Sequence, residues 1–207
     1  MKILHINSSV QGDQSASRQL TAHIVQGLSA QSPGAELIYR DLAADPIAHL
    51  TAEVLAGRMD AARIDTFDEG KRGDIATGNR ALAEFLAADV IVIGAPMYNF
   101  SIPSQLKAWI DRVSVAGSTF RYSAAGPEGL AKGKKIVIAS SRGGVYSEGA
   151  FAFMDHQETY LRGVFNFLGV TDISFVRAEG YAHDAARRNE AVALARKTYP
   201  HPVALAA

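Results

Sequence analysis

The sequence predicts an α/β protein built on a five-stranded parallel sheet with helices on both faces. Short apolar runs and longer amphipathic stretches alternate five times along the 207 residues, without an internal repeat. One run, residues 89–95 (DVIVIGA), is apolar on both faces, which is typical of a central strand covered by helices on both sides. The length suits a single domain, so we expect residues 1–207 to form one unit.

Five segments have the composition of buried strands, because each is short, rich in apolar residues and followed by a polar or glycine-containing stretch. They are residues 2–7, 36–41, 89–95, 135–140 and 171–178. In the second segment we expect Leu37 and Tyr39 to face opposite to Ile38, since side chains alternate along a strand.

Six segments repeat apolar residues at helical spacing or carry helix start and stop residues. They are residues 15–30, 51–59, 75–88, 104–115, 154–168 and 184–197. We expect Ser17 to cap the first helix and Gly169 to end the fifth. Residues 42–74 are too long for an ordinary connection, which suggests a lid or binding loop. Residues 117–133 read as a long glycine-rich connection, and the tail, 200–207, is expected to fray.

Composition and charge exclude several classes of protein. Lys plus Arg and Asp plus Glu both number 21, so the formal net charge is +0 and the basic surplus of a nucleic-acid binder is missing. The sequence has no cysteine, which removes disulfides, thiolate metal sites and cysteine nucleophiles. There is no run of roughly 18 apolar residues and no secretory leader, so we expect a cytoplasmic protein that does not contact membranes. The histidines lack metal-ligand spacing, and we expect no metal site.

The loop after the first strand, residues 8–17, has the composition of an anion site. Ser9, Ser15, Ala16 and Ser17 would place hydroxyls and backbone amides at a helix N-terminus. The loop has neither the lysine of a nucleotide P-loop nor the spaced glycines of a dinucleotide fingerprint, which favours a phosphate monoester held by neutral donors. A serine-rich turn that only caps the helix explains this loop equally well.

The loop after the third strand carries Met97, Tyr98, Asn99 and Phe100 between two prolines. Its backbone amides can donate to a ring edge, and its apolar and aromatic side chains can line a planar ligand. An aromatic loop of this kind could also be a dimer contact.

The loop after the fourth strand contains Ser141, Arg142, Gly143 and Gly144, and paired glycines let the backbone approach a ligand closely. Alone this is a weak indication. Ligands of open parallel sheets bind beyond the carboxyl ends of the strands, where the strand order reverses. Such a sheet brings the loops after strands one, three and four together, so they predict one shared ligand site.

These residues resemble those of the FMN-dependent NADH-azoreductases, also called NADH:quinone oxidoreductases, of the flavodoxin-like group. The resemblance covers nearly the whole chain and is most specific in the Met-Tyr-Asn-Phe and Thr-Phe-Arg-Tyr runs. The matching stretches are residues 8–9, 15–17, 41–43, 95–100, 102–107, 119–122, 126–130, 141–144 and 178–180. Little aligns between residues 54 and 73, which leaves the substrate lid and substrate preference open.

The resemblance implies a flavodoxin-like fold and an assignment of the three loops to FMN. Ser9 and residues 15–17 would hold the phosphate and nearby ribityl oxygens, residues 97–100 would wrap the isoalloxazine ring, and residues 141–144 would contact its pyrimidine end. It also implies a homodimer with two interfacial flavin sites. The implied cycle is ping-pong: NADH gives a hydride to flavin N5 and leaves, and a quinone or azo compound then takes two electrons. No side chain is expected to be catalytic, because the flavin carries the chemistry.

Several points stay open at this stage. Aromatic side chains are candidates for the walls of the acceptor pocket, with plain core packing as the alternative for each: Phe120, Tyr122, Tyr146, Phe151 and Phe153. Arginines in the variable stretch could contact the nicotinamide dinucleotide or face water, so NADH is not separated from NADPH: Arg58, Arg63 and Arg72. A flavodoxin-type electron carrier is a second hypothesis, although such carriers are typically acidic and this chain is neutral. A fold that has lost its cofactor and acts through protein contacts is a third.

Overall fold

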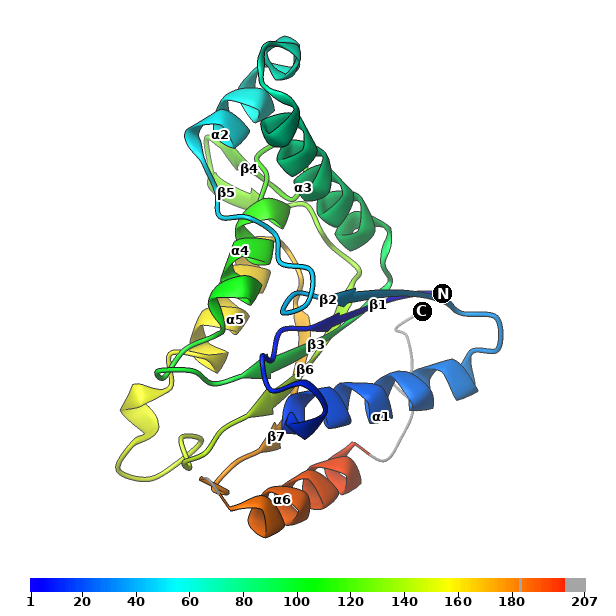
Figure 1. Cartoon of the computed structure of the whole chain (residues 1–207), viewed down its shortest axis with the longest axis vertical. Coiled ribbons are helices and arrows are strands. Elements are labelled where there is room, and N and C mark those ends of the chain that lie inside the picture. The colour runs from blue at the N-terminus through cyan, green and yellow to red at the C-terminus, as the bar shows by residue number, and fades with distance from the viewer. Residues whose placement is uncertain (183, 200–207) are drawn as a thin grey trace.

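The computed structural model describes residues 1–182 and 184–199, and its centre is a five-stranded parallel sheet in the order β2-β1-β3-β6-β7 (Figure 1). The strands are β1 (Lys2–Asn7), β2 (Glu36–Asp41), β3 (Val90–Pro96), β6 (Lys135–Ser141) and β7 (Asp172–Ala178). Each predicted strand is therefore confirmed to within one residue at either end. The chain order reverses between β1 and β3, so the carboxyl ends of these two strands form the switch point of the sheet.

All six predicted helices are present, and all but α2 cover the two faces of the sheet (Figure 1). They are α1 (Ala16–Gln31), α2 (Ala52–Met59), α3 (Glu69–Ala87), α4 (Ser104–Val113), α5 (Glu158–Phe167) and α6 (Ala185–Thr198). Short 3₁₀ turns lie at Gly12–Gln14, Ala61–Thr66 and Ala152–Met154. Helices α1 and α6 pack on one face, and α3, α4 and α5 pack on the other. Within the described ranges, no helix is long and apolar enough to cross a membrane.

Strand β3 is buried along its whole length, as its two-sided apolar composition predicts. Val92 packs toward α1 and α6, whereas Ile93 packs toward Trp109 of α4 on the other face. The edge strand β2 behaves differently, because Tyr39 is half exposed while Ile38 packs on the core. The central strand is therefore buried on both faces, whereas the edge strand is only partly buried, mainly on one face.

Three helix starts differ from the prediction. Helix α5 begins at Glu158, four residues after the predicted Met154, because Ala152–Met154 forms a separate 3₁₀ turn. Ser15, not Ser17, caps α1, because its hydroxyl accepts the Arg18 backbone N–H at 3.2 Å, the usual third-residue geometry of a cap. Helix α3 begins at Glu69, six residues before the predicted start, because Asp68 caps it through the Lys71 N–H. The first turns of α3 are polar and solvated, so they carry no apolar period.

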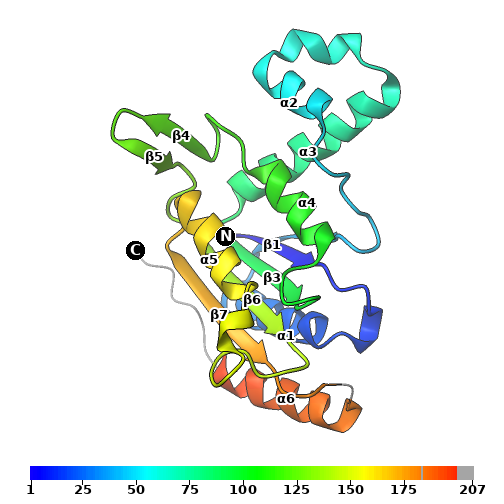
Figure 2. The ribbon, with the colours of Figure 1, turned by 90° about the vertical axis from the view of Figure 1, so that its left-hand side faces the viewer.

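The connection 117–133 is not irregular, because it contains an antiparallel hairpin of β4 (Phe120–Ser123) and β5 (Gly126–Gly129). The hairpin docks on the end of α5, where Gly129 lies directly against Gly169. Gly169 has φ +99° and follows the last helical turn, which confirms it as the residue that ends α5. Figure 2 shows the hairpin and the α2 region projecting from the body of the molecule.

The stretch 42–74 is held to the body by arginines. Arg58 of α2 donates to the backbone oxygens of Arg112 (2.8 Å) and Asp111 (3.3 Å), which caps the C-terminus of α4. Burial lowers the pKa of Arg58, and the neighbouring Arg112 adds to this lowering. Arg112 is itself buried and paired with Asp74. Arg58 therefore has a structural partner, whereas Arg63 is exposed and Arg72 bonds the Phe67 carbonyl. The predicted frayed tail, 200–207, lies outside the described residues.

Candidate functional site

The sheet brings the three predicted loops together at one edge, because they follow the neighbouring strands β1, β3 and β6. The Met97 N–H donates to the Ser141 carbonyl at 2.8 Å, which joins the second loop to the third. The Ser8 hydroxyl donates to the Gly94 carbonyl at 2.6 Å, and the Tyr98 hydroxyl lies 3.3 Å from the Ser9 hydroxyl. Direct hydrogen bonds therefore connect all three loops.

The serine loop presents neutral donors. Ser9, Ser15 and Ser17 are buried, and the Ser15 and Ser17 hydroxyls lie 3.0 Å apart at the start of α1. Arg18 follows the loop, but its guanidinium is occupied by Asp41 at 2.6 and 2.7 Å and by the Ser9 carbonyl at 2.8 Å. The same bond lowers the pKa of Asp41. A phosphate here would therefore meet hydroxyls and first-turn amides rather than a free cation.

The second loop is a tight turn with an unusual backbone. Asn99 and Phe100 have φ of 48° and 69°, and Tyr98 and Ser101 exchange backbone hydrogen bonds of 2.9 and 3.1 Å across them. Asparagine tolerates this left-handed region, but an aromatic residue there costs about 1–2 kcal/mol. The cost is offset locally, because the His156 N–H donates to the Phe100 carbonyl at 3.1 Å.

The second and third loops enclose a cavity of about 350 Å³, which we call the ring cavity. Its lining residues are Met97, Asn99, Phe100, Gly143, Gly144, Tyr146 and Ala182. The Phe100 ring meets the Tyr146 ring edge-on at 6.0 Å. A Cβ added to Gly144 would lie 3.0 Å from the Tyr146 ring, so a side chain at this position would have to push that wall of the cavity aside. Flat apolar walls beside exposed backbone suit a planar heteroaromatic ligand.

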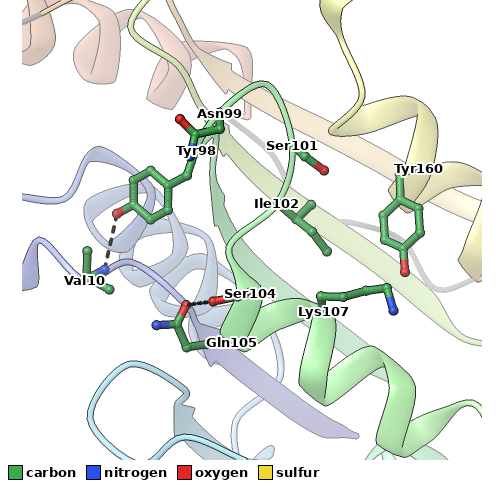
Figure 3. Close-up of a pocket in the computed structure, with 9 residues that line it drawn as sticks. All are labelled: Val10, Tyr98, Asn99, Ser101, Ile102, Ser104, Gln105, Lys107 and Tyr160. Carbon is green, nitrogen blue, oxygen red and sulfur yellow. Dashed lines mark hydrogen bonds between the residues drawn. The ribbon is translucent and has the colours of Figure 1, made fainter. Parts of the chain in front are cut away.

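A second cavity of about 620 Å³ adjoins the ring cavity, since Asn99 lines both. Its lining residues are Val10, Tyr98, Asn99, Ser101, Ile102, Ser104, Gln105, Lys107 and Tyr160 (Figure 3). Tyr160 of α5 and Lys107 of α4 point toward one another at its far end. Lys107 is paired with Asp111 at 2.6 Å, and burial raises the pKa of Tyr160 to about 12. The tyrosine therefore stays neutral at ordinary pH.

Arg142 was expected to contact the cofactor, but its side chain is buried away from the ring cavity. The guanidinium pairs with Asp155 at 2.8 Å and with Glu158, and Glu179 lies 3.9 Å away. Its backbone N–H is also taken, by the Ala178 carbonyl at 2.9 Å, so only the backbone carbonyl of Arg142 remains available to a ligand. Its acidic partners could not be singled out from the sequence, because an isolated Asp or Glu near a helix start reads as a solvated cap.

The predicted pocket aromatics are dispersed. Tyr146 lines the ring cavity, but Phe151 lies on an exposed loop and lines neither cavity. Phe120 packs on Phe167 with ring centroids 4.8 Å apart, and Tyr122 packs on Phe120. The hairpin that carries both lies where α5 ends, at the opposite edge of the sheet from the three loops (Figure 2). A single chain therefore does not bring Phe120 or Tyr122 to its own ring cavity.

His5 lies within β1, as predicted, and is buried. Its pKa is lowered to about 4, chiefly by burial, with a smaller lowering by the charge of Arg18 and an opposing hydrogen bond with Asn7. Across residues 1–182 and 184–199, no three His, Cys, Asp or Glu side chains gather as a metal site would require.

The chain matches known proteins over nearly its full length. A family profile described as a flavodoxin-like fold covers residues 1–201. The chain is 57% identical over 199 residues to an FMN-dependent NADH:quinone oxidoreductase of Sinorhizobium fredii, an alignment covering 96% of this chain and 95% of the relative. It is 50% identical to a protein of the same name from a Bradyrhizobium species, with complete coverage of both.

Solved structures agree. Azoreductase AzrA superposes with a TM-score of 0.84 at 28% identity, covering 96% of each chain. An FMN-dependent NADH-azoreductase from Bacillus anthracis, solved in complex with FMN, superposes with a TM-score of 0.83 at 25% identity, covering 96% of this chain and 97% of that one. The chain therefore belongs to the flavodoxin-like family of FMN-dependent NADH:quinone oxidoreductases.

Proposed function

We propose that this protein is an FMN-dependent oxidoreductase that uses NADH to reduce quinones and to cleave azo compounds reductively. The observation that carries the proposal is the meeting of the serine loop, the 97–100 turn and the 141–144 loop at one sheet edge. The electron-carrier alternative is less supported, because the relatives are named as enzymes and the formal net charge of this chain is +0.

The residues present fit FMN at three points. The serine loop offers hydroxyls and helix-start amides to a phosphate, the ring cavity offers apolar walls, and the glycines at 143 and 144 expose backbone. We assign the cofactor contacts accordingly, Arg142 through its backbone: Ser9, Ser15, Ala16, Ser17, Met97, Tyr98, Asn99, Phe100, Ser141, Arg142, Gly143 and Gly144. When bound, FMN supplies the two-electron chemistry.

The protein's own contribution is orientation and the exclusion of water. The tight turn fixes the backbone amides of Asn99 and Phe100, and fixed dipoles stabilise negative charge without reorganising. Tyr146 closes one wall of the ring cavity. Donor and acceptor would occupy the same position beside the flavin in turn, which is the basis of ping-pong kinetics.

We propose that the protein acts as a homodimer in the cytoplasm. Phe120 and Tyr122 are remote from the ring cavity of their own chain, and Tyr122 is 74% exposed. Phe151 and Phe153, on a separate part of the surface, are also exposed, and exposed large aromatics favour an interface. These four side chains would therefore line an acceptor pocket at the boundary between two copies.

Absorbance and steady-state kinetics test the function. Apoprotein mixed with FMN should shift the flavin absorbance bands, and the holoprotein should oxidise NADH when a benzoquinone or an azo dye is supplied. Double-reciprocal plots should be parallel, and an azo dye should consume two NADH per bond cleaved. Protein that binds no FMN, or that is reduced only through a partner reductase, would contradict the proposal. Parallel assays with NADPH would establish the donor preference.

A further inference from the structure

A buried chain of hydrogen bonds links the two loops of the ring cavity. Arg142 Nε donates to the Ser140 hydroxyl at 3.0 Å, and that hydroxyl donates to Gln157 Oε1 at 3.0 Å. Gln157 Nε2 then donates to the carbonyl of Ala95 at 2.8 Å. Ser140 and Gln157 are 0% exposed and Arg142 is 1% exposed. This series of hydrogen bonds runs from the third loop to the end of β3, directly before the 97–100 turn.

The backbone around Gln157 fastens the same two loops. The His156 N–H bonds the Phe100 carbonyl at 3.1 Å, which holds the turn in its left-handed conformation. One oxygen of Asp155 accepts the N–H groups of Gln157 and Glu158 at 3.0 and 2.9 Å, while the other pairs with Arg142. The segment 155–158 therefore contacts both loops although it lines neither cavity.

Two guanidinium groups and three carboxylates lie around this segment. Arg142 and Arg177 face Asp155, Glu158 and Glu179, and the side chains of Arg142 and Glu158 are almost completely buried. Glu179 also accepts the N–H groups of Tyr146 and Ser147. Buried polar groups of this kind are costly when a partner is lost, so the arrangement has little freedom to relax.

We propose that Gln157 is a positioning residue, which sets the spacing of the 97–100 turn and the 141–144 loop and thereby the affinity of the ring cavity for the flavin. This inference rests on the proposed FMN binding. Gln157 would act through Ala95 and Ser140, without touching the cofactor itself.

The test compares FMN dissociation constants, measured by quenching of flavin fluorescence, for wild type and four variants. Gln157→Met keeps the side-chain volume but removes the hydrogen bonds to Ser140 and Ala95. Ser140→Ala removes the hydroxyl that joins Arg142 to Gln157. Gln157→Glu can make both bonds only when protonated. Leu28→Ala removes a buried side chain at the far end of α1 and serves as a control for general loss of stability.

We expect Gln157→Met to weaken FMN binding about tenfold or more, and Ser140→Ala to weaken it several-fold, with Leu28→Ala within about twofold of wild type. For Gln157→Glu, the ratio of its dissociation constant to that of wild type should rise as pH increases from 5.5 to 8. Taking the ratio cancels pH effects that both proteins share, such as the titration of the FMN phosphate.

Three outcomes decide the proposal. If Gln157→Met and Ser140→Ala both bind FMN like wild type, or if Leu28→Ala is weakened equally, Gln157 has no positioning role. If Gln157→Met does not fold, the proposal is tested by Ser140→Ala and by the pH ratio of Gln157→Glu, and a flat ratio with normal Ser140→Ala binding overturns it. Wild type that binds no FMN would instead contradict the proposed function.

Discussion

A single methyl group should distinguish the two glycines of the ring cavity. A Cβ at Gly144 would lie 3.0 Å from the Tyr146 ring, whereas a Cβ at Gly143 would meet Ala182 at an ordinary 3.4 Å. We expect Gly144→Ala to displace Tyr146 and weaken FMN binding roughly tenfold, since overpacking typically costs about 1–3 kcal/mol. Gly143→Ala, whose added Cβ would face Ala182, should have the smaller effect, so comparing the two variants isolates the contact with Tyr146. Flavin fluorescence titration measures both, and equal effects would contradict the geometry.

The buried imidazole of His5 makes stability depend on pH. Its pKa is about 4 in the folded protein and near 6.5 when unfolded, so the unfolded chain binds the extra proton between these values. The stability from this residue is complete at pH 7 and falls as the pH drops through 6.5 toward 4. The loss should reach about 2 kcal/mol at pH 5.

Urea unfolding of the apoprotein at pH 7 and pH 5 measures this effect. His5→Phe removes the titrating group, and one ring nitrogen, Nε2, has no hydrogen-bond partner to lose. The variant should therefore lose less stability than wild type between the two pH values. An identical loss would assign the acid sensitivity to other groups.

At the scale of elements, the β4–β5 hairpin depends on one close backbone contact. A Cβ at Gly129 would lie 2.2 Å from the backbone nitrogen of Gly169, so Gly129→Ala must push the hairpin off α5. We expect a loss of about 2 kcal/mol or more in the free energy of unfolding. Gly27→Ala on α1 is the contrast, because it has open space and should stabilise by about 0.5–1 kcal/mol. Denaturant unfolding that ranks the two the other way would refute this role of the contact.

Elements with a strong apolar period could be predicted from the sequence, and elements held by distant partners could not. Strand β3 is apolar on both faces, a pattern that is visible in its own sequence, so its bounds were predicted to within one residue. The hairpin has four-residue strands, one containing Pro127, and it is stabilised by packing on α5, which no local pattern reports. The start of α3 was missed for a similar reason, since its first turns are solvated.

The same contrast applies to the site. The three loops were predicted because strand order alone brings them together. Gln157 was not predicted, since its role arises from two partners 62 and 17 residues away in sequence. Arg142 was predicted as a cofactor contact from its place in the loop, but its side chain forms ion pairs with Asp155 and Glu158 instead.

At the scale of the whole molecule, dimerisation and cofactor binding should be visible in stability. Light scattering at micromolar concentration should give twice the chain mass, and the unfolding midpoint should rise with protein concentration. FMN at 100 times its dissociation constant should add about 2.7 kcal/mol. Tyr122→Ser, on the exposed hairpin, should weaken acceptor turnover more than FMN affinity. A monomer at all concentrations would contradict the interfacial acceptor pocket.

The fastening of both ring-cavity loops by residues 155–158 has a consequence for how quickly the cofactor arrives. Loops that are already bonded to one another do not have to be ordered when the ligand enters, so little conformational entropy is lost at that step. The observed rate of FMN association in stopped-flow mixing should therefore increase linearly with FMN concentration, without the plateau that a slow rearrangement imposes. On this basis the FMN site is already formed in the apoprotein and does not close around the cofactor when it binds.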